Sequence, residues 1–296
     1  MKAFNAWLVV GSLLLLLPTC KPKQEQATYS PSSKELESRT HATAQLVDNN
    51  GETLLQRISP PDGYQRIPVS QTSFAYYLRT LPLKPAGTLV SYYDGRTKSN
   101  KGVYVAVVDL PIGKRDLHQC ADAIMRLRAE YLYQQKAFDR IHFNFTNGFR
   151  VDYTPWMQGK RIAVEGNRTY WVQKTTPSNT YQDFWKYLEI IFSYAGTLSL
   201  EKELQATSVD QLKIGDVFIQ GGSPGHAVVV VDVAINPTTK QKVFMLAQSY
   251  MPAQEIQILS NIEDASMSPW YSTNFGETLY TPEWTFKKTT LKRFAD

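Results

Sequence analysis

Two stretches of the chain repeat hydrophobic positions with the spacing of an amphipathic helix. Residues 117–138 lack glycine and proline and are rich in Ala, Leu, Arg, Glu and Gln, which predicts a long helix that Asp116 can cap. Residues 181–196 place apolar side chains from Phe184 to Phe192 on one face, and a glycine then ends the pattern. The pattern therefore predicts two helices, each with one face packed against another layer.

Short apolar runs separated by turn residues follow from Leu212 onward. The runs DVFIQ, HAVVVVDVA, KVFMLAQSY and AQEIQIL are bounded by Gly, Pro and polar residues, as in antiparallel strands. Upstream, residues 41–113 suggest a helix followed by a hairpin, and residues 138–153 alternate around the turn TNG. The sequence therefore predicts an α+β fold, with both helices packed on a C-terminal antiparallel sheet.

The first nineteen residues have the layout of a secretory signal peptide, with a charged start and an apolar run from Trp7 to Leu17 that is too short to span a bilayer. The run ends in LPTC, which resembles the lipobox of bacterial lipoproteins. Cys20 is therefore the expected lipidation site, and the membrane is the expected partner through that lipid. The alternative is an ordinary signal peptide with a chance cysteine. We expect residues 1–19 to be removed, residues 20–40 to form a flexible tether and residues 41–296 to form one domain.

The charge balance argues against one class of function. Removing residues 1–19 takes away Lys2 and no acidic residue, which leaves 31 basic and 27 acidic side chains. This excess is small and no basic run is interleaved with aromatic residues, so nucleic acid is not an expected partner. The chain has no HExxH motif or paired-cysteine spacing, and the loop over residues 221–225 lacks the Lys and Ser/Thr of a phosphate loop. We therefore expect no metal and no cofactor.

If Cys20 carries lipid, Cys120 is the one thiol of the mature chain. Cys120 lies in the first turns of the helix predicted over residues 117–138, where unpaired N–H groups and the helix dipole favour an anion. A lowered thiol pKa is therefore expected, as in a reactive nucleophile. The alternative is an inert buried cysteine, because Cys120 shares a helical stripe with Ile124 and Leu127.

A histidine opens the most apolar strand of the chain, directly after the loop GGSPG. His226 can take the thiol proton of Cys120 if the helix packs on this strand, and we expect the sulfur and a ring nitrogen within about 4 to 5 Å of each other. A return loop centred on Pro237 would place Gln248 opposite His226, where the amide oxygen can orient the imidazole. Asp232 lies roughly 20 Å along the strand, so we expect it to be solvated or to cap the turn.

The block LKIGDVFIQGGSPGHAVVVVDVA resembles the centre of the NlpC/P60 cysteine peptidases, in which a histidine opens a strand after a Gly-Asp turn. Over nearly the whole mature chain, segments such as HQCADAIMRLRAEYLY, LAQSYMPAQ and TPEWTF are similar to an uncharacterised family of Bacteroidota lipoproteins, the domain of unknown function 4846. The peptidase resemblance implies a papain-like core with Cys120 as nucleophile, His226 as general base and Gln248 as orienting group. Two features depart from the peptidase pattern: the sequence around Cys120 and the long stretch that separates it from His226.

That long stretch contains Trp156 in TPWMQGKR, an expected surface loop that could shape a substrate cleft, so Trp156 is the candidate for substrate binding. Two functions of different classes fit these features. The first is an envelope-anchored cysteine hydrolase of the amidase or peptidase type, acting on peptidoglycan peptide. The second is a non-catalytic binding or assembly lipoprotein on the same fold, using the aromatic residues near the C-terminus. Because no acidic cluster follows the lipobox, the periplasmic face is the expected location.

Overall fold

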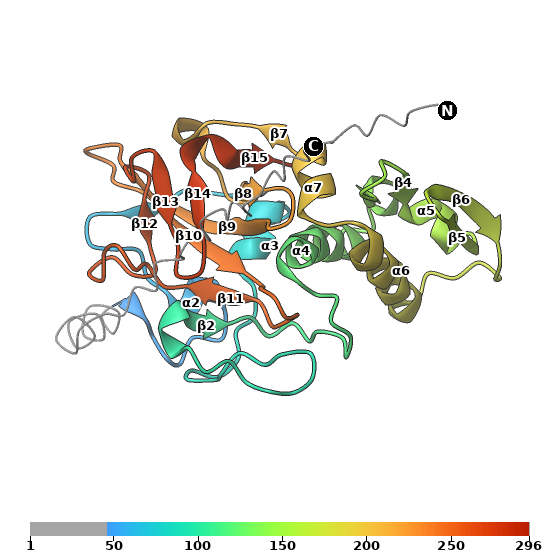
Figure 1. Ribbon diagram of the computed structural model, residues 1–296. Coiled ribbons are helices and arrows are strands. Elements are labelled where there is room, and N and C mark those ends of the chain that lie inside the picture. Colours follow the sequence, from blue (N-terminus) through green and yellow to red (C-terminus); the bar gives the residue numbers. More distant parts are fainter. Residues whose placement is uncertain (1–45, 296) are drawn as a thin grey trace, which may run out of the picture.

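The computed structural model describes residues 46–295 (Figure 1). The expected signal peptide, the lipidation site Cys20 and the tether over residues 20–40 lie outside the described residues. The expected domain over residues 41–296 is described except at its two ends. Between residues 46 and 295, no helix has the length and apolar character needed to cross a membrane.

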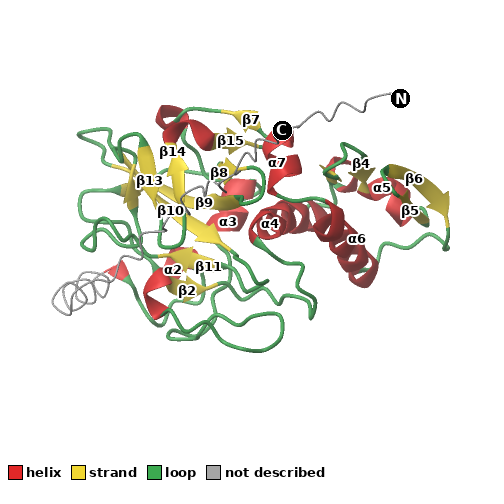
Figure 2. Cartoon of the chain, viewed as in Figure 1, coloured by secondary structure: helices red, strands yellow, loops and turns green. Residues whose placement is uncertain are grey.

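A nine-stranded antiparallel sheet forms the centre of the described residues (Figures 1 and 2). Its main strands follow the order β2, β11, β10, β9, β8, β15 and β7, while β1 pairs with part of β9 and β12 with part of β10. The strands are β1 (Gln65–Arg66), β2 (Tyr104–Val107), β7 (Gln205–Ala206), β8 (Val217–Gln220), β9 (His226–Ile235), β10 (Lys242–Gln248), β11 (Gln257–Leu259), β12 (Tyr271–Ser272) and β15 (Leu291–Arg293). A separate hairpin joins β13 (Thr278–Tyr280) to β14 (Thr285–Lys287).

Strand β9 lies inside the core, with β8 and β10 on either side. Every residue from His226 to Ala234 is buried, because the run of valines offers no polar face to solvent. Two helices, α4 (Cys120–Gln134) and α3 (Phe74–Arg79), pack against this strand. The predicted α+β class and the large antiparallel sheet are therefore confirmed, and α4 packs on the sheet as expected.

The second predicted helix is present as α6 (Tyr181–Tyr194), with Phe184, Leu188 and Ile191 buried. It packs mainly against α4 and α5 (Tyr153–Met157), so the expectation that it lies on the sheet is wrong (Figure 1). Its apolar face is instead covered by these two helices. Within the described residues, the other helices are α2 (Leu54–Arg57), α7 (Thr197–Glu203) and the short 3-10 turns η1 (Lys101–Val103), η2 (Phe138–Arg140), η3 (Val209–Gln211) and η4 (Lys288–Thr290).

The chain between α4 and α6 forms an insertion that projects away from the sheet (Figure 1). It contains α5 and two hairpins, β3 (His142–Asn144) with β4 (Arg150–Asp152) and β5 (Lys160–Glu165) with β6 (Arg168–Gln173). The first hairpin confirms the pairing predicted around TNG. The expected surface loop around Trp156 is instead α5, and the indole is only 3% exposed, packed edge-on against Tyr187 of α6.

Strand β9 also carries a buried carboxylate. Asp232 is fully buried, and it accepts from Arg66 Nε at 2.6 Å and from Arg79 Nε at 2.7 Å. The expectation that Asp232 is solvated or caps the turn is therefore wrong. A carboxylate deep in a strand needs cations to replace its lost hydration, and β1 and α3 supply one arginine each.

Candidate functional site

Cys120 is the first residue of α4, and its thiol faces the beginning of β9. The backbone N–H groups of Ala121 and Ala227 point toward the sulfur, and Ala227 directly follows His226 in β9. Cys120 is only 6% exposed. The fold thus brings the helix start to the mouth of the strand that carries His226. The separation between the sulfur and the imidazole stays a prediction.

Burial, with a smaller contribution from the neighbouring Asp122, raises the pKa of the Cys120 thiol to about 11. The N–H groups around the sulfur lower this pKa, but by less than burial raises it. The expectation of a lowered thiol pKa is therefore wrong. The helix dipole and the nearby N–H groups are outweighed because the sheet removes water from the sulfur, and a thiolate loses more from that than a neutral thiol.

This high pKa predicts slow alkylation of Cys120 in the folded protein. At pH 7 the thiolate fraction should be about a hundredfold smaller than in an ordinary cysteine, so iodoacetamide should modify Cys120 more slowly by at least that factor. The rate should rise with pH until the pH approaches about 11. Mass spectrometry of the Cys120 peptide measures the rate, and unfolding in urea should restore the rate of free cysteine. Alkylation at pH 7 as fast as that of free cysteine would contradict the burial argument.

The loop before His226 depends on glycine at two positions. Gly222 has a φ of +122°, which disfavours other residues. A Cβ atom on Gly225 would lie 2.5 Å from both the Gly222 carbonyl oxygen and Thr197 Oγ1, so there is no space for a side chain. The loop therefore turns tightly into β9 and delivers His226, which pairs with Gln220 of β8, as a fully buried residue.

The imidazole of His226 is held by the end of β10. Its Nε2 lies 2.7 Å from Gln248 Oε1, and both side chains are buried. The expectation that Gln248 pairs directly with His226 across the two strands is wrong. Ala247 pairs with Val229, and this register moves Gln248 along β10 from the position opposite His226. A β-bulge between Met245 and Leu246 changes the register by one residue and thereby returns Gln248 to the face of His226.

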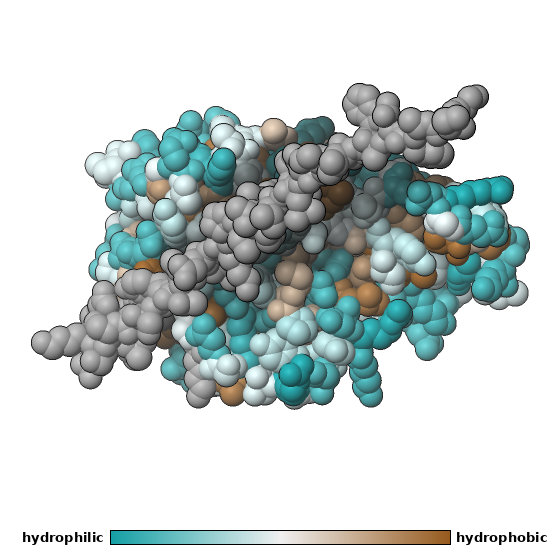
Figure 3. Space-filling view, viewed as in Figure 1, coloured by the Kyte–Doolittle hydropathy of each residue, from teal (hydrophilic) through white to brown (hydrophobic). Residues whose placement is uncertain are grey.

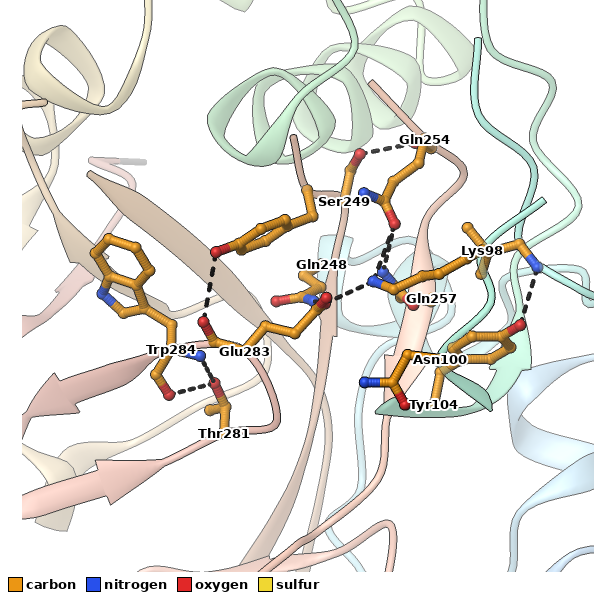
Figure 4. Close-up of polar contacts among 12 residues, drawn as sticks. Lys98, Asn100, Tyr104, Gln248, Ser249, Gln254, Gln257, Thr281, Glu283 and Trp284 are labelled. Atoms are coloured by element: carbon orange, nitrogen blue, oxygen red, sulfur yellow. Dashed lines mark hydrogen bonds and ion pairs between the residues drawn. The ribbon is translucent and has the colours of Figure 1, made fainter. Parts of the chain in front are cut away.

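Gln248 is itself fixed by the partly buried ion pair of Glu283 and Lys98, and Figure 4 shows these side chains together. Its Nε2 donates to Glu283 Oε2 at 2.6 Å, and Lys98 Nζ lies 2.6 Å from the same carboxylate oxygen. Lys98 also donates to Gln254 Oε1 at 3.1 Å, as does Gln257 Nε2. A polar network therefore runs from the imidazole into the interior behind β10.

This network determines which nitrogen of His226 carries the proton. The carboxylate of Glu283 can only accept a hydrogen bond, so the amide of Gln248 must turn its NH₂ toward Glu283 and its oxygen toward His226. That oxygen can only accept, which makes Nε2 the protonated nitrogen and leaves a free lone pair on Nδ1. Nδ1 is buried and has no hydrogen-bond partner within residues 46–295. Burial lowers the pKa of His226 to about 4, so the resting imidazole is neutral.

Aromatic side chains cover the imidazole. The ring centroid of Tyr250 lies 4.8 Å from that of His226, and those of Trp284 and Phe286 lie at 5.4 and 5.9 Å. Tyr250 is also within electrostatic range of Cys120, because the thiolate contributes to raising the pKa of the phenol, after burial and Glu283. Tyr250 therefore lies near both candidate catalytic groups.

Trp156 does not belong to this cluster. It lies in the insertion, separated from β9 by α6 and α4 (Figure 1). Its indole N–H donates to the carbonyl oxygen of Asp183 at 3.0 Å, and the guanidinium of Arg161 stacks over its ring at 4.0 Å. Among the described residues, no group of three His, Cys, Asp or Glu side chains is placed to hold a metal ion.

Glu283, Lys98 and Tyr250 are the residues of the cluster that the sequence did not reveal. Glu283 lies within TPEWTF, where a carboxylate directly before the aromatic residues Trp284 and Phe286 is a weak signal for a partly buried charge that needs a partner. Tyr250 follows Gln248 by two positions, which is weak evidence for a shared site. Lys98 stands in a polar turn and carries no local signal of its role.

Comparison with known proteins identifies one relationship. A family model described as Domain of unknown function (4846) matches residues 54–293. The matched range includes Cys120, His226, Gln248 and Glu283. No curated protein matches the chain, and no solved structure does.

Proposed function

The chain therefore belongs to the family of domain of unknown function 4846, and we propose that this member is a cysteine hydrolase that cleaves amide bonds. One observation carries the proposal: Nδ1 of His226 is buried without a partner among the described residues, while Nε2 is locked by Gln248. A buried polar atom without a partner costs about 1 to 3 kcal/mol. Such a cost is explained if the atom must stay free to accept the proton of Cys120 during a reaction.

In the proposed reaction, Nδ1 of His226 takes the thiol proton while the sulfur of Cys120 attacks the carbonyl carbon of the substrate. The N–H of Cys120 at the helix start helps to stabilise the oxyanion. The C–N bond then breaks, the leaving amine takes the proton from Nδ1, and a thioester remains on Cys120. Water attacks the thioester and gives its proton to Nδ1, which returns it to the sulfur as the carboxylic acid leaves.

The raised thiol pKa and lowered imidazole pKa define the resting state of the proposed enzyme. Thiol and imidazole are both neutral, so the proton moves during attack instead of residing on His226 beforehand. Gln248 accepts from the Nε2–H and stabilises the imidazolium as it forms. The Glu283–Lys98 ion pair keeps the Gln248 amide from rotating, which would present an N–H to the imidazole instead.

The packing of α4 on β9 supports a papain-like core of the NlpC/P60 kind as part of the proposal. We place the protein in the cell envelope, anchored through lipid on Cys20 and facing the periplasm. Peptidoglycan peptide is then the first substrate to test, because it is an amide polymer within reach of an anchored enzyme.

The test is to incubate the mature protein with a peptidoglycan digest and with a panel of synthetic peptides. Mass spectrometry should detect new cleavage products and, after acid quenching, an acyl group on Cys120. The Cys120→Ser variant should give neither, because the oxygen is a far weaker nucleophile in a site built for sulfur. Products formed equally by wild type and Cys120→Ser would overturn the assignment of Cys120, and an unmodified substrate panel would remove support for hydrolysis.

The second candidate function is a binding or assembly lipoprotein on the same fold. The complete burial of His226 and the high thiol pKa favour it, because both describe a site closed to substrate. In that case the wild type should retain peptidoglycan fragments in a pull-down without cleaving them. Retention should then be unchanged in the Cys120→Ser variant.

A further inference from the structure

A cavity of about 560 Å³ lies where α5 and β5 of the insertion, the segment over residues 174–178 after β6, and α6 meet. This volume falls within the range of pockets that take small molecules. Trp156, Ile162 and Ile190 supply apolar wall, and Thr175, Thr176 and Ser178 supply hydroxyl groups. Neither Cys120 nor His226 lines it, so the cavity is separate from the proposed hydrolase site.

Cations outnumber carboxylates in the wall of this cavity. Arg161, Lys174 and Lys186 line it with only Asp183 opposing them, which gives the wall a net charge of +2. Charged groups that converge in a concave surface focus their potential and attract ligands of opposite charge. Figure 3 shows hydrophilic residues at the end of the molecule formed by the insertion, with hydrophobic residues between them.

The carboxylate of Asp183 is already occupied by groups of the protein. It accepts from the hydroxyls of Ser178 and Thr180, and Lys186 Nζ lies 3.3 Å from Oδ1. These hydrogen bonds lower the pKa of Asp183, with Ser178 the largest cause, so the group stays ionised. Asp183 can therefore balance only one of the three cations.

Arg161 and Lys174 remain able to pair with a bound anion. Arg161 directs Nη1 to the carbonyl oxygens of Trp156 and Lys160, and its Nη2 lies 3.8 Å from Asp183, too far for a hydrogen bond. Its guanidinium is fixed over the Trp156 ring, so its orientation is set before any ligand arrives. Within the described part of the chain, Lys174 forms no ion pair.

We propose that this cavity binds a small organic anion, with its acidic group between Arg161, Lys174 and Lys186 and its apolar body against Ile162 and Ile190. Carboxylate and phosphate share the required chemistry, since both accept several hydrogen bonds from cationic donors. A cationic ligand of the same shape is excluded by the net positive wall. The inference is independent of hydrolysis at Cys120.

Three probes of similar shape test the proposal: benzoate, phenyl phosphate and benzylamine. The indole N–H of Trp156 is the reporter, because it donates to the Asp183 carbonyl beside the cavity. In ¹H–¹⁵N spectra of the ¹⁵N-labelled protein, this signal should shift in a saturable manner with benzoate or phenyl phosphate and not with benzylamine. Tighter binding of phenyl phosphate identifies a phosphate ligand, and tighter binding of benzoate identifies a carboxylate.

Charge reversal provides the matched variants. Lys174→Glu combined with Lys186→Glu changes two exposed side chains of the cavity and should weaken binding at least tenfold. Lys202→Glu combined with Lys213→Glu makes the same change in net charge at exposed positions outside the cavity wall and should leave binding unchanged. Equal weakening in both variants, equal binding of benzylamine, or no saturable shift with either anion would overturn the proposal.

Discussion

Replacing His226 by alanine is expected to lower kcat/KM for amide hydrolysis by at least about a thousandfold. The resting thiol has a pKa of about 11, so it needs a base to lose its proton during attack. His226 can act as this base, because its Nδ1 has no hydrogen-bond partner among the described residues while its Nε2 is bound to Gln248. Initial rates at pH 7 on the cleaved substrate, with the wild type measured in parallel, give the ratio directly.

The matched control for His226→Ala is His142→Ala. His142 lies in β3 of the insertion, with Nε2 3.6 Å from Glu203, and it takes no part in the network behind β10. Its loss should leave kcat/KM within about twofold of wild type, an expectation based on the usual independence of distant sites. Thermal unfolding of each variant shows whether the fold is retained. A similar loss of activity in both variants would mean that the effect comes from folding and not from removal of the base.

Sequence periodicity located the elements that build the core, because their burial pattern is local. The valine run of β9 and the amphipathic pattern of α6 each require a buried face wherever the chain places them. Periodicity did not reveal what each face packs against. Helix α6 packs on α4 and α5 instead of the sheet, and α5 replaced an expected loop because burial of the Trp156 ring outweighs the proline and glycine signals around it.

The strand register shows a second limit. Because β9 is buried on both faces, a shift by one residue exchanges one apolar set for another, and the pattern does not fix the register. The bulge at Met245 and Leu246 could not be predicted from that pattern. It is nevertheless what brings Gln248 onto the face of His226, so the contact expected from sequence forms through a register that was not expected.

The sequence predicted which chemical groups form the candidate site, but neither their pKa values nor the residues that hold them. A thiol at a helix start and a histidine at a strand start are local features, and the packing of α4 on β9 brings the N–H of Ala227, next to His226, to the Cys120 sulfur. The thiol pKa depends on burial by distant segments and therefore came out opposite to the dipole argument. Glu283 stands 35 residues from Gln248, and Lys98 stands 185 residues from Glu283, so no spacing rule connects them.

Replacing Asp232 by alanine is expected to lower the free energy of unfolding by about 3 to 5 kcal/mol. The change would leave two arginines, Arg66 and Arg79, without the carboxylate that compensates their burial. It would also remove the acceptor of the Val233 N–H, which donates to Asp232 Oδ1 at 2.8 Å. Urea unfolding followed by circular dichroism measures the loss as a lower midpoint with an unchanged slope.

Two further variants test whether the stability lost in Asp232→Ala comes from the burial of its ion pairs. Asp94→Ala removes the partner of Arg96, a pair whose side chains are 29% and 69% exposed, and it should barely change the urea midpoint because water replaces the interaction.

A triple variant with Asp232→Leu, Arg66→Met and Arg79→Leu removes the charges together and should recover much of the stability lost by Asp232→Ala, since no unpaired charge remains in the core. If the triple variant is less stable than Asp232→Ala, the arginines stabilise the fold through contacts other than neutralisation of Asp232. Their hydrogen bonds to the carbonyl oxygens of Ile58 and Ile67 would then be the first contacts to examine.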